Sequence, residues 1–482
     1  MSNVRKNFIY NILFQIISVV IPIILAPFLS RTLGPDGMGT YSFTYSIAYY
    51  FMLFTMLGVN NYGSRTIAKV KKNEDKLSKT FFEIHSIQIF LGSVMFLLFL
   101  GLLMFCDQQY RNILAVQSIF IISAAFDINW FFYGMEDFKT ITIRSLVLKI
   151  ISCVSIFLLV RNANDIWIYT FIMAITALAS QVVLWPFLAK YVKRTRICFS
   201  DISKHIKPLV ILFVPVVAIS LYKIMDKVMI GFMSDINEVG LYEYAEKINS
   251  IPLTIITALG TVMLPRVTSV SEDTKKVKNY INESIKFVLF ITIPIIFFFN
   301  ISMSTIIPIY LGPGYDKTIV ISILLSITLP IISFANVIRM QYLIPMGKDK
   351  IYVWSVVLGA LLNLIVNLML IPVVGSYGAC IGTIVAEIAV MLFQTICVWK
   401  EISLKDSLHV WLETLAKSFI AYVVAMLVSI FVNTSDLGWC SMQIILYWVI
   451  YGLLNIKYIN CRLYIPLKNI FFQNALLTKT KK

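Results

Sequence analysis

Long apolar stretches separated by short polar segments run along the chain. Each approaches or exceeds the ~20 residues that a helix needs to cross a bilayer. Strands of membrane β-barrels are about 10 residues long and alternate apolar with polar positions, so a barrel is excluded. Fourteen stretches fit the helical pattern, at roughly 8–30, 40–62, 81–105, 113–133, 144–160, 166–189, 208–232, 241–265, 286–309, 318–345, 353–373, 378–399, 409–432 and 440–460. We expect an all-α polytopic membrane protein with about 12–14 transmembrane helices.

The distribution of basic residues predicts the orientation of these helices. Segments on one side of the predicted membrane hold 31 of the 41 Lys and Arg residues, and six more lie inside the apolar stretches. The opposite side holds only Arg31, Arg111, Arg161 and Lys317. Because cytoplasmic loops carry the excess of Lys and Arg, both termini are predicted to be cytoplasmic. The expected location is the cell (inner) membrane, crossed many times.

Composition agrees with a membrane protein and narrows the chemistry. Hydrophobic residues make up 59% of the 482 residues, more than a soluble protein of this size can bury. The net charge of +16 lies in the loops, where topology explains it, so nucleic acid is not an expected partner. The seven cysteines form no C-x-x-C pair and the three histidines are scattered. We therefore expect no metal site and no cofactor.

A short repeat divides the chain into two similar halves. Leu33-Gly34-Pro35-Asp36-Gly37-Met38-Gly39-Thr40-Tyr41 and Ser234-Asp235-Ile236-Asn237-Glu238-Val239-Gly240-Leu241-Tyr242 both place a turn before Gly-x-Tyr, 201 residues apart. Six spans separate the copies, so both enter the membrane from the same side, as in parallel-repeat transporters. The predicted division is a six-helix bundle over 1–205, a second over 206–404, and two extra helices with a basic cytoplasmic tail over 405–482. The bundles are expected to enclose a central cavity.

Charged residues inside the predicted spans are the main candidate site, because each costs at least ~2.5–3.5 kcal/mol to insert. The seventh span carries Lys223, Asp226 and Lys227, and the eighth carries Glu243, Glu246 and Lys247, each set on one helical face. A short hairpin makes these helices neighbours, so the two faces are expected to meet. They form either a buried salt-bridge network or a charged wall of the cavity, and the two interpretations can coexist.

Other polar residues in the spans are weaker candidates. Glu387 lies near the middle of the twelfth span and is either a proton or cation site or a packed acid. Tyr41, Tyr45 and Tyr49 repeat every four residues, and they either pack or offer hydroxyls and ring faces to sugars. At the end of the fourth span, an interfacial aromatic belt is the alternative to a functional role. The candidates there are Asp127, Asn129, Trp130 and Tyr133.

Four sequence features together resemble a known family. They are Arg31-x-Leu33-Gly34-Pro35-x-x-x-Gly39-x-Tyr41; Trp130-Phe131-x-x-Gly134-x-Glu136 after Asp127; Asp226-x-x-x-Ile230-Gly231 leading to Gly240-x-Tyr242; and Asn363-x-x-x-Asn367, Pro372, Gly375, Gly378-Ala379 and Gly382-Thr383. In this order, over roughly residues 1–400, they resemble the polysaccharide-unit flippases, the Wzx type of the MATE-like flippase superfamily.

The resemblance implies a function and assigns roles. It implies transport of undecaprenyl-diphosphate-linked oligosaccharide units by alternating access, with polymerase and chain-length proteins of the same pathway as partners. A basic cavity would compensate the diphosphate, and the candidates here are Lys223, Lys227, Lys247 and Arg31. Asp226, Glu243, Glu246, Glu387 and Asp127 would form the charge network or couple transport to a proton or sodium gradient. Tyr41, Tyr45, Tyr49, Asn129 and Trp130 would contact sugars.

Two other functions remain open. A drug or cation exporter of the same fold predicts a cavity dominated by acids, whereas the lysines here favour an anion. A membrane polymerase or glycosyltransferase predicts catalytic carboxylates or arginines in a sizeable outer loop, but the loops here are short. We find no nucleophile motif, phosphate-binding Gly loop or metal cluster, so no catalytic residue is proposed.

Overall fold

A computed structural model describes residues 17–18, 20–195, 199–268, 274–399, 401–402, 405–429 and 436–456. Twelve of its helices are long and apolar enough to cross a membrane, and the predicted all-α polytopic fold is confirmed. The first predicted stretch, 8–30, lies partly outside the described residues, and its described part includes the helix Val20–Thr32. The eighth stretch lies in a helix that is not among the twelve. The predicted orientation of the termini stays a prediction.

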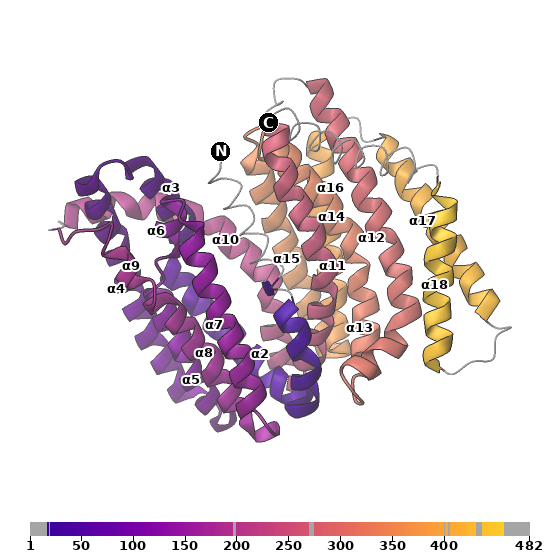
Figure 1. Ribbon diagram of the computed structural model, residues 1–482, viewed down its shortest axis with the longest axis horizontal. Helices are drawn as coiled ribbons and strands as arrows, with labels where there is room; N and C mark the ends of the chain where they lie inside the picture. Colours follow the sequence, from indigo (N-terminus) through magenta and orange to yellow (C-terminus); the bar gives the residue numbers. More distant parts are fainter. Residues whose placement is uncertain are drawn as a thin grey trace, which may run out of the picture.

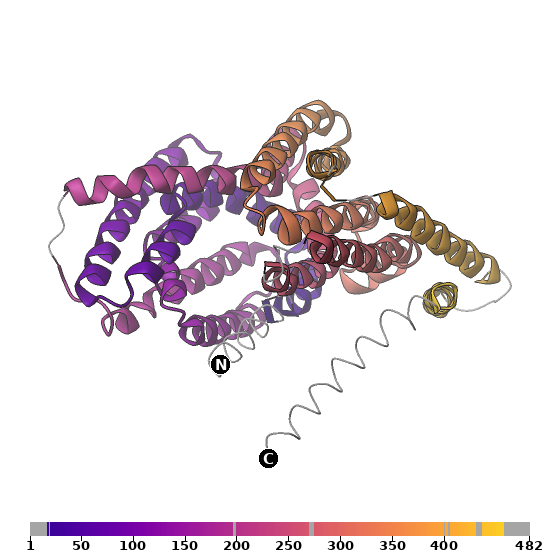
Figure 2. The ribbon, with the colours of Figure 1, turned by 90° about the horizontal axis from the view of Figure 1, so that it is seen from above.

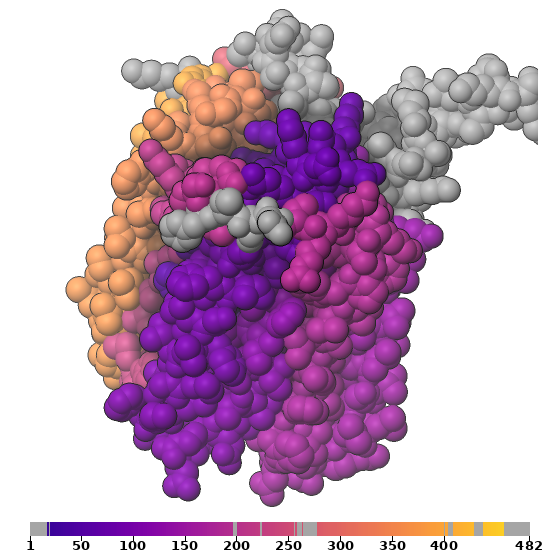
Figure 3. Space-filling model, turned by 90° about the vertical axis from the view of Figure 1, so that its left-hand side faces the viewer, coloured from indigo at the N-terminus to yellow at the C-terminus, as the bar shows by residue number. Residues whose placement is uncertain are grey.

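The helices that follow Val20–Thr32 form the first of two lobes, drawn in indigo to magenta in Figure 1. Its elements are α2 (Gly34–Met56), α3 (Val59–Val70), α4 (Glu74–Phe105), α5 (Gln108–Ala125), α6 (Asn129–Gly134), α7 (Phe138–Leu159), a 3-10 turn (Ala163–Asp165), α8 (Ile166–Val182) and α9 (Trp185–Leu188). Figure 3 looks onto this lobe, and the orange segments of the rest of the chain are seen only along one edge.

A second lobe and a terminal helix pair complete the fold. The second lobe comprises α10 (Phe199–Met233), α11 (Ile236–Thr268), α12 (Thr274–Tyr310), α13 (Asp316–Ser326), α14 (Thr328–Ile338), a π-helix (Arg339–Leu343), α15 (Asp349–Val374) and α16 (Ser376–Val398). The terminal pair, α17 (Lys405–Ser429) and α18 (Asp436–Leu454), lies at the far side of the second lobe in Figure 2. Helix α10 runs through residue 205, where the sequence placed the boundary between the bundles.

Glycine and proline set the limits of the helices nearest the lobe junction. Pro35 lies in the first turn of α2, where its missing N–H costs no hydrogen bond. The same helix ends where Gly58 adopts a left-handed φ of 76°, and α3 then leaves in a new direction. A methyl group at Gly58 would also lie 3.0 Å from the Leu209 carbonyl oxygen of α10. Gly58 therefore allows both the turn and the approach of α10.

The lobes meet where α2 packs on α11. Gly39 lies so close to α11 that an added Cβ would be 1.9 Å from the Ile236 carbonyl oxygen. Gly240 lies equally close to α2, 1.9 Å from the Pro35 carbonyl oxygen. Residues of both lobes, among them Tyr41 and Tyr244, share one buried apolar cluster around this crossing. Figure 1 shows α2 beside the second lobe at the end where α2 begins.

Helix α10 contacts both lobes. Near its start, His205 is buried, with Nε2 2.8 Å from Glu83 Oε2 and Nδ1 2.6 Å from the Tyr62 hydroxyl, so it is fixed to α4 and α3. Further along, it packs against α15 and α16 of the second lobe. Figure 1 shows α10 passing from the top of the first lobe towards the second.

The terminal pair is attached to α12 by tyrosine hydroxyls. Pro294 inside α12 has no N–H to donate, so the Phe290 carbonyl four residues earlier loses its helical partner. The Tyr451 hydroxyl of α18 donates to that carbonyl at 2.8 Å, and Tyr447 donates to the Pro294 carbonyl at 3.0 Å. The pair is thus an integral part of the fold, because it satisfies a backbone group within the membrane.

Candidate functional site

The charged faces of α10 and α11 meet, as the sequence predicted, and form a compact ion-pair cluster. Lys227 Nζ lies 2.8 Å from Glu243 Oε2 and 2.9 Å from Glu246 Oε2. Lys247 Nζ lies 3.1 Å from Glu243 Oε1. The side chains of Lys227 and Glu243 are 15% and 13% exposed, whereas those of Lys247 and Glu246 are 32% and 40% exposed. The cluster therefore has a buried core and a more open rim.

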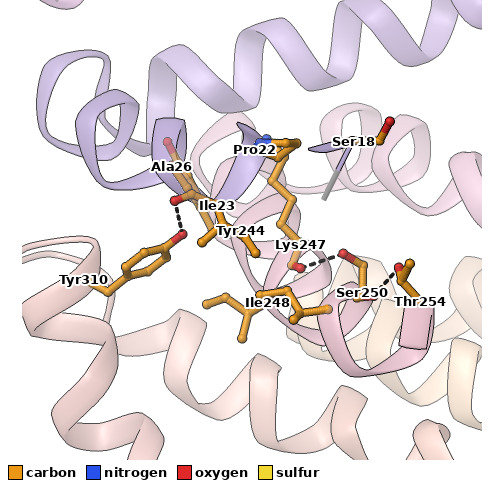
Figure 4. A pocket seen from close by; sticks show the side chains of 11 residues that line it. Ser18, Pro22, Ile23, Ala26, Tyr244, Lys247, Ile248, Ser250, Thr254 and Tyr310 are labelled. Atoms are coloured by element: carbon orange, nitrogen blue, oxygen red, sulfur yellow. Dashed lines mark hydrogen bonds between the residues drawn. The ribbon is translucent and has the colours of Figure 1, made fainter. Parts of the chain in front are cut away.

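The cluster also reaches the first lobe and borders a cavity. The Ser42 hydroxyl of α2 donates to Glu243 Oε2 at 2.8 Å, across the lobe junction. Lys247 lines a cavity of ≈ 220 Å³ between the helix Val20–Thr32 and α11. Figure 4 shows the Lys247 side chain extending towards Pro22, with Ser250 and Thr254 on the same helix nearby. A cation and hydroxyl groups thus border one small space between the lobes.

The tyrosine stripe of α2 lies against this cluster. Tyr41 is buried and stacks on Tyr45 with a centroid separation of 5.7 Å, and its ring meets Tyr169 edge-on at 4.7 Å. Tyr45 and Tyr49 are only partly buried, with centroids 6.4 Å apart. Tyr41 is therefore a packing residue in this conformation, while Tyr45 and Tyr49 present accessible aromatic surface.

Asp226 has a different environment from its neighbours in the sequence. It is 3% exposed and accepts hydrogen bonds from Asn367 Nδ2 at 2.6 Å, Thr383 Oγ1 at 2.7 Å and the Tyr242 hydroxyl at 2.9 Å. In the described part of the chain these partners are all neutral, and Asn367 Oδ1 has no hydrogen-bond partner. We refer to Asp226, Tyr242, Asn363, Asn367 and Thr383 as the Asp226 cage.

The other predicted cavity residues are distributed more widely. Arg31 donates to the carbonyls of Pro27 and Ile309, at 3.0 and 2.6 Å, and so binds the end of α12 rather than the ion-pair cluster. Glu387 is buried on α16, one turn beyond Thr383. The side chain of Lys223 lies outside the described residues. Within the described ranges, no three His, Cys, Asp or Glu side chains gather as metal ligands would.

The candidates near residue 130 form a structural network inside the first lobe. Asp127 Oδ1 accepts from Asn129 Nδ2 at 2.7 Å, and Asn129 Oδ1 accepts from the buried Arg144 at 3.0 Å. Trp130 is fully buried, stacks on Phe81 at 5.5 Å and donates to Gln88 at 3.2 Å. The interior of the lobe encloses Trp130, whereas Asn129 is partly exposed, and the contact of these two residues with sugars stays a prediction.

Sequence reasoning assigned no site role to four residues that the structure brings into these networks. Ser42 offers no signal of its own in a tyrosine-rich helix. Arg144 was counted among loop charges, yet it is 8% exposed inside the lobe. The pair Asn363 and Asn367 gave the best signal, since two amides four residues apart in an apolar helix share a face and need partners.

The arrangement of two helical lobes is shared by solved structures of membrane proteins. "Lipid II flippase MurJ, inward closed conformation" matches with a TM-score of 0.70 at 15% identity, covering 94% of this chain and 99% of that chain. An inward-facing multidrug resistance MATE family transporter of the MOP superfamily gives 0.56 at 14% identity, covering 80% and 95%. These likenesses show the fold.

The family follows from the sequence. Residues 4–271 match the family model described as "Polysaccharide biosynthesis protein", and the chain belongs to that family. It is 23% identical over 392 residues to "Putative O-antigen transporter" of Escherichia coli (strain K12), covering 80% of this chain and 94% of the relative. The resemblance to the Wzx-type flippases is thereby confirmed, as is a multi-pass membrane protein.

Proposed function

We propose that this protein moves undecaprenyl-diphosphate-linked oligosaccharide units from the cytoplasmic to the outer face of the inner membrane by alternating access. The observation that carries the proposal is the ion-pair cluster of Lys227, Glu243, Glu246 and Lys247 at the junction of the lobes. A diphosphate with several sugars cannot cross hydrocarbon alone, because its polar groups would go unsatisfied. Lys227 and Lys247 provide ion pairs within the membrane, and Lys247 also borders a cavity.

The charge balance of the cluster suits reversible binding. Each lysine already has a carboxylate partner, so the empty site is near neutral and stable in the membrane. A phosphate group can replace the more exposed Glu246 as a partner of Lys227, and the carboxylate can return when the substrate leaves. Tyr45 and Tyr49, on the facing helix of the other lobe, offer ring faces and hydroxyls suited to sugars.

The names of similar proteins support this substrate class. One relative is named as an O-antigen transporter, and a solved structure with the same fold is a lipid II flippase. We therefore propose that the class of substrate is a sugar unit on a lipid carrier. Export of such a unit would supply polymerase and chain-length proteins acting at the outer face.

The proposal includes coupling to a cation at the Asp226 cage. A buried carboxylate in a membrane span whose partners among the described side chains are all neutral is a candidate for a proton or sodium ion. The unpartnered Asn367 Oδ1 supports this assignment, because a rotated amide would present that oxygen beside Asp226 as a further ligand. Thr383 and Asn363 supply additional oxygen atoms of the kind that hard cations prefer.

The deciding test asks on which membrane face the lipid-linked unit accumulates in cells that lack this protein. Accumulation on the cytoplasmic face, reversed by restoring the gene, is the expected result. Unpolymerised units at the outer face would contradict the proposal and favour a polymerase. An unchanged sugar-lipid pool would favour export of a small molecule or cation instead.

A variant series connects that test to the cluster. Lys227→Ala and Lys247→Ala should each reduce export by about tenfold or more, since hydrogen bonds to charged groups contribute roughly 1.5–3 kcal/mol. Lys417→Ala is the matched control, because Lys417 also forms an ion pair inside a helix of this protein, with Glu413 at 2.6 Å, but in α17. Normal export in both cluster variants, at normal membrane abundance, would remove the cluster as the diphosphate site.

A further inference from the structure

The crossing of α2 and α11 is built from contacts that repeat with the 201-residue offset of the sequence repeat. Gly39 faces the Ile236 carbonyl, and its repeat partner Gly240 faces the Pro35 carbonyl, which is the repeat partner of Ile236. In each case an added Cβ would lie 1.9 Å from the oxygen. This reciprocal arrangement means that a local two-fold axis passes between the helices at this point.

Two polar contacts lie on the same axis. Asn237 Nδ2 donates to Asp36 Oδ1 at 2.9 Å, and the Ser42 hydroxyl donates to Glu243 Oε2 at 2.8 Å. Both pairs are separated by 201 residues, so each joins equivalent positions of the two halves. The contacts run from the first turn of α2, at the end predicted to face outward, to the level of the ion-pair cluster. They close this end of the junction.

Glu243 belongs to the closure and to the ion-pair cluster at once. The oxygen that accepts from Ser42 is also 2.8 Å from Lys227 Nζ, and the other carboxylate oxygen is 3.1 Å from Lys247 Nζ. Glu243 is therefore held against α2 while both lysines neutralise it. A buried carboxylate that loses its cationic partners costs several kcal/mol unless water reaches it.

We propose that Glu243 couples ligand binding to opening of the α2–α11 closure, an inference that rests on the proposed function. Phosphate oxygens that engage Lys227 and Lys247 take the counter-charges from Glu243. The closed crossing then holds an uncompensated carboxylate, and separation of α11 from α2 relieves it by admitting water. An occupied site thus favours the open outer end, and an empty site favours the closed one.

The closure can be measured by cross-linking in the full-length protein. Cysteines replace Asp36 and Asn237, which lie in contact and at the end of the junction. A protease site inserted after Thr195 divides the chain, and a short bifunctional thiol reagent keeps the halves joined only when the closure is present. Each single-cysteine variant reports the background from the native cysteines.

Glycine substitutions test the closure without any ligand. Gly39→Ala and Gly240→Ala should each lower the cross-linked fraction by at least about fivefold, because a methyl group cannot fit against the opposing carbonyl. Gly101→Ala and Gly452→Ala are matched helical controls, since an added Cβ meets nothing within 4 Å at either position. Equal cross-linking in all four variants would overturn the closure. Ser42→Ala, which adds no bulk, should lower the fraction less and guards against misfolded glycine variants.

Inorganic diphosphate tests the coupling. It should lower the cross-linked fraction in the protein with Glu243 and leave it unchanged in Glu243→Gln, whose neutral amide needs no counter-charge. Binding is followed separately as a shift in melting temperature that Lys227→Ala or Lys247→Ala removes. Binding without any change in cross-linking would overturn the coupling and leave the proposed function standing. Absence of binding would overturn both the coupling and phosphate recognition by the cluster, whereas the glycine variants would still report on the closure.

Discussion

Two aspartates, one in each lobe, differ in how the protein compensates their charge: Asp127 is partly buried and Asp226 is buried. Asp127 of the first lobe is linked through Asn129 to the guanidinium of Arg144. Asp226 of the second lobe is bound by an amide, a hydroxyl and a phenol, all of them neutral. Both carboxylates occur in a region where charge is expensive, yet only the first has a cation in its described network.

This difference in charge compensation distinguishes a structural aspartate from a candidate functional one more clearly than the extent of burial does. A charge that is balanced inside the lobe needs nothing from outside, and Arg144 also donates to the Ser180 carbonyl of α8 and to the Ser145 hydroxyl. That network joins three segments of the first lobe and stabilises it. The Asp226 cage joins α10, α11, α15 and α16, and its described hydrogen-bond partners bring no positive charge to the carboxylate.

The largest effect predicted from this comparison is on stability. Arg144→Ala should lower the free energy of unfolding by about 2–3 kcal/mol, because it leaves Asn129 and the Ser180 carbonyl without their donor and the partly buried Asp127 without its nearby cation. Thermal or detergent-induced unfolding of the purified protein measures the loss. Arg339→Ala is a matched control, since Arg339 bonds only within its own turn to Asn336 and stacks on Tyr352. A loss no larger than that of the control would show that Asp127 needs no internal cation.

The fold could be predicted from the sequence because transmembrane helices appear in it as long apolar runs. A span has to satisfy its own backbone, so length and hydropathy fix it with little help from tertiary contacts. The sequence repeat also predicted contacts, because residues 201 positions apart meet in the structure. Gly39 lies against the start of α11 near Gly240, and Ser42 bonds to Glu243. Equivalent positions met because the halves pack about a local axis.

The site could be predicted only in part, because side-chain partners depend on how distant helices are placed. The meeting of Lys227 with Glu243 and Glu246 followed from one short hairpin. Asp226 shares a face with Lys227 in the sequence, yet two of its three partners come from α15 and α16, 141 and 157 residues away. Trp130 was predicted to contact sugars, with an interfacial aromatic belt as the alternative. The packing of Phe81 and Gln88 around it shows instead that it lies in the core of the lobe.

The second prediction concerns the response to cations. Asp226→Asn should weaken sodium-induced stabilisation, or the dependence of export on the ion gradient, by about tenfold or more, because the charge that attracts the cation is gone. Asp127→Asn should leave that response intact. The response is measured as the sodium- or pH-dependent shift in melting temperature and as gradient-dependent export in vesicles. If Asp226→Asn kept the response and Glu387→Gln lost it, the ion site would lie at Glu387, one turn beyond Thr383 on α16.

The smallest effect expected is at Thr383, and it separates a cation site from a merely packed acid. Thr383→Val keeps the shape of the side chain but removes the hydroxyl that lies 2.7 Å from Asp226 Oδ2. A ligand oxygen of this kind contributes roughly 1 kcal/mol, so half-maximal stabilisation should need about fivefold more sodium. Thr395→Val is the control on the same helix, because Thr395 donates only to its own backbone, at the Met391 carbonyl. If Asp226 were simply a packed, protonated acid, Thr383→Val would lower stability equally with and without sodium. A shift in the sodium requirement that occurs in Thr383→Val but not in Thr395→Val therefore distinguishes an acid that binds a cation from a packed, protonated acid.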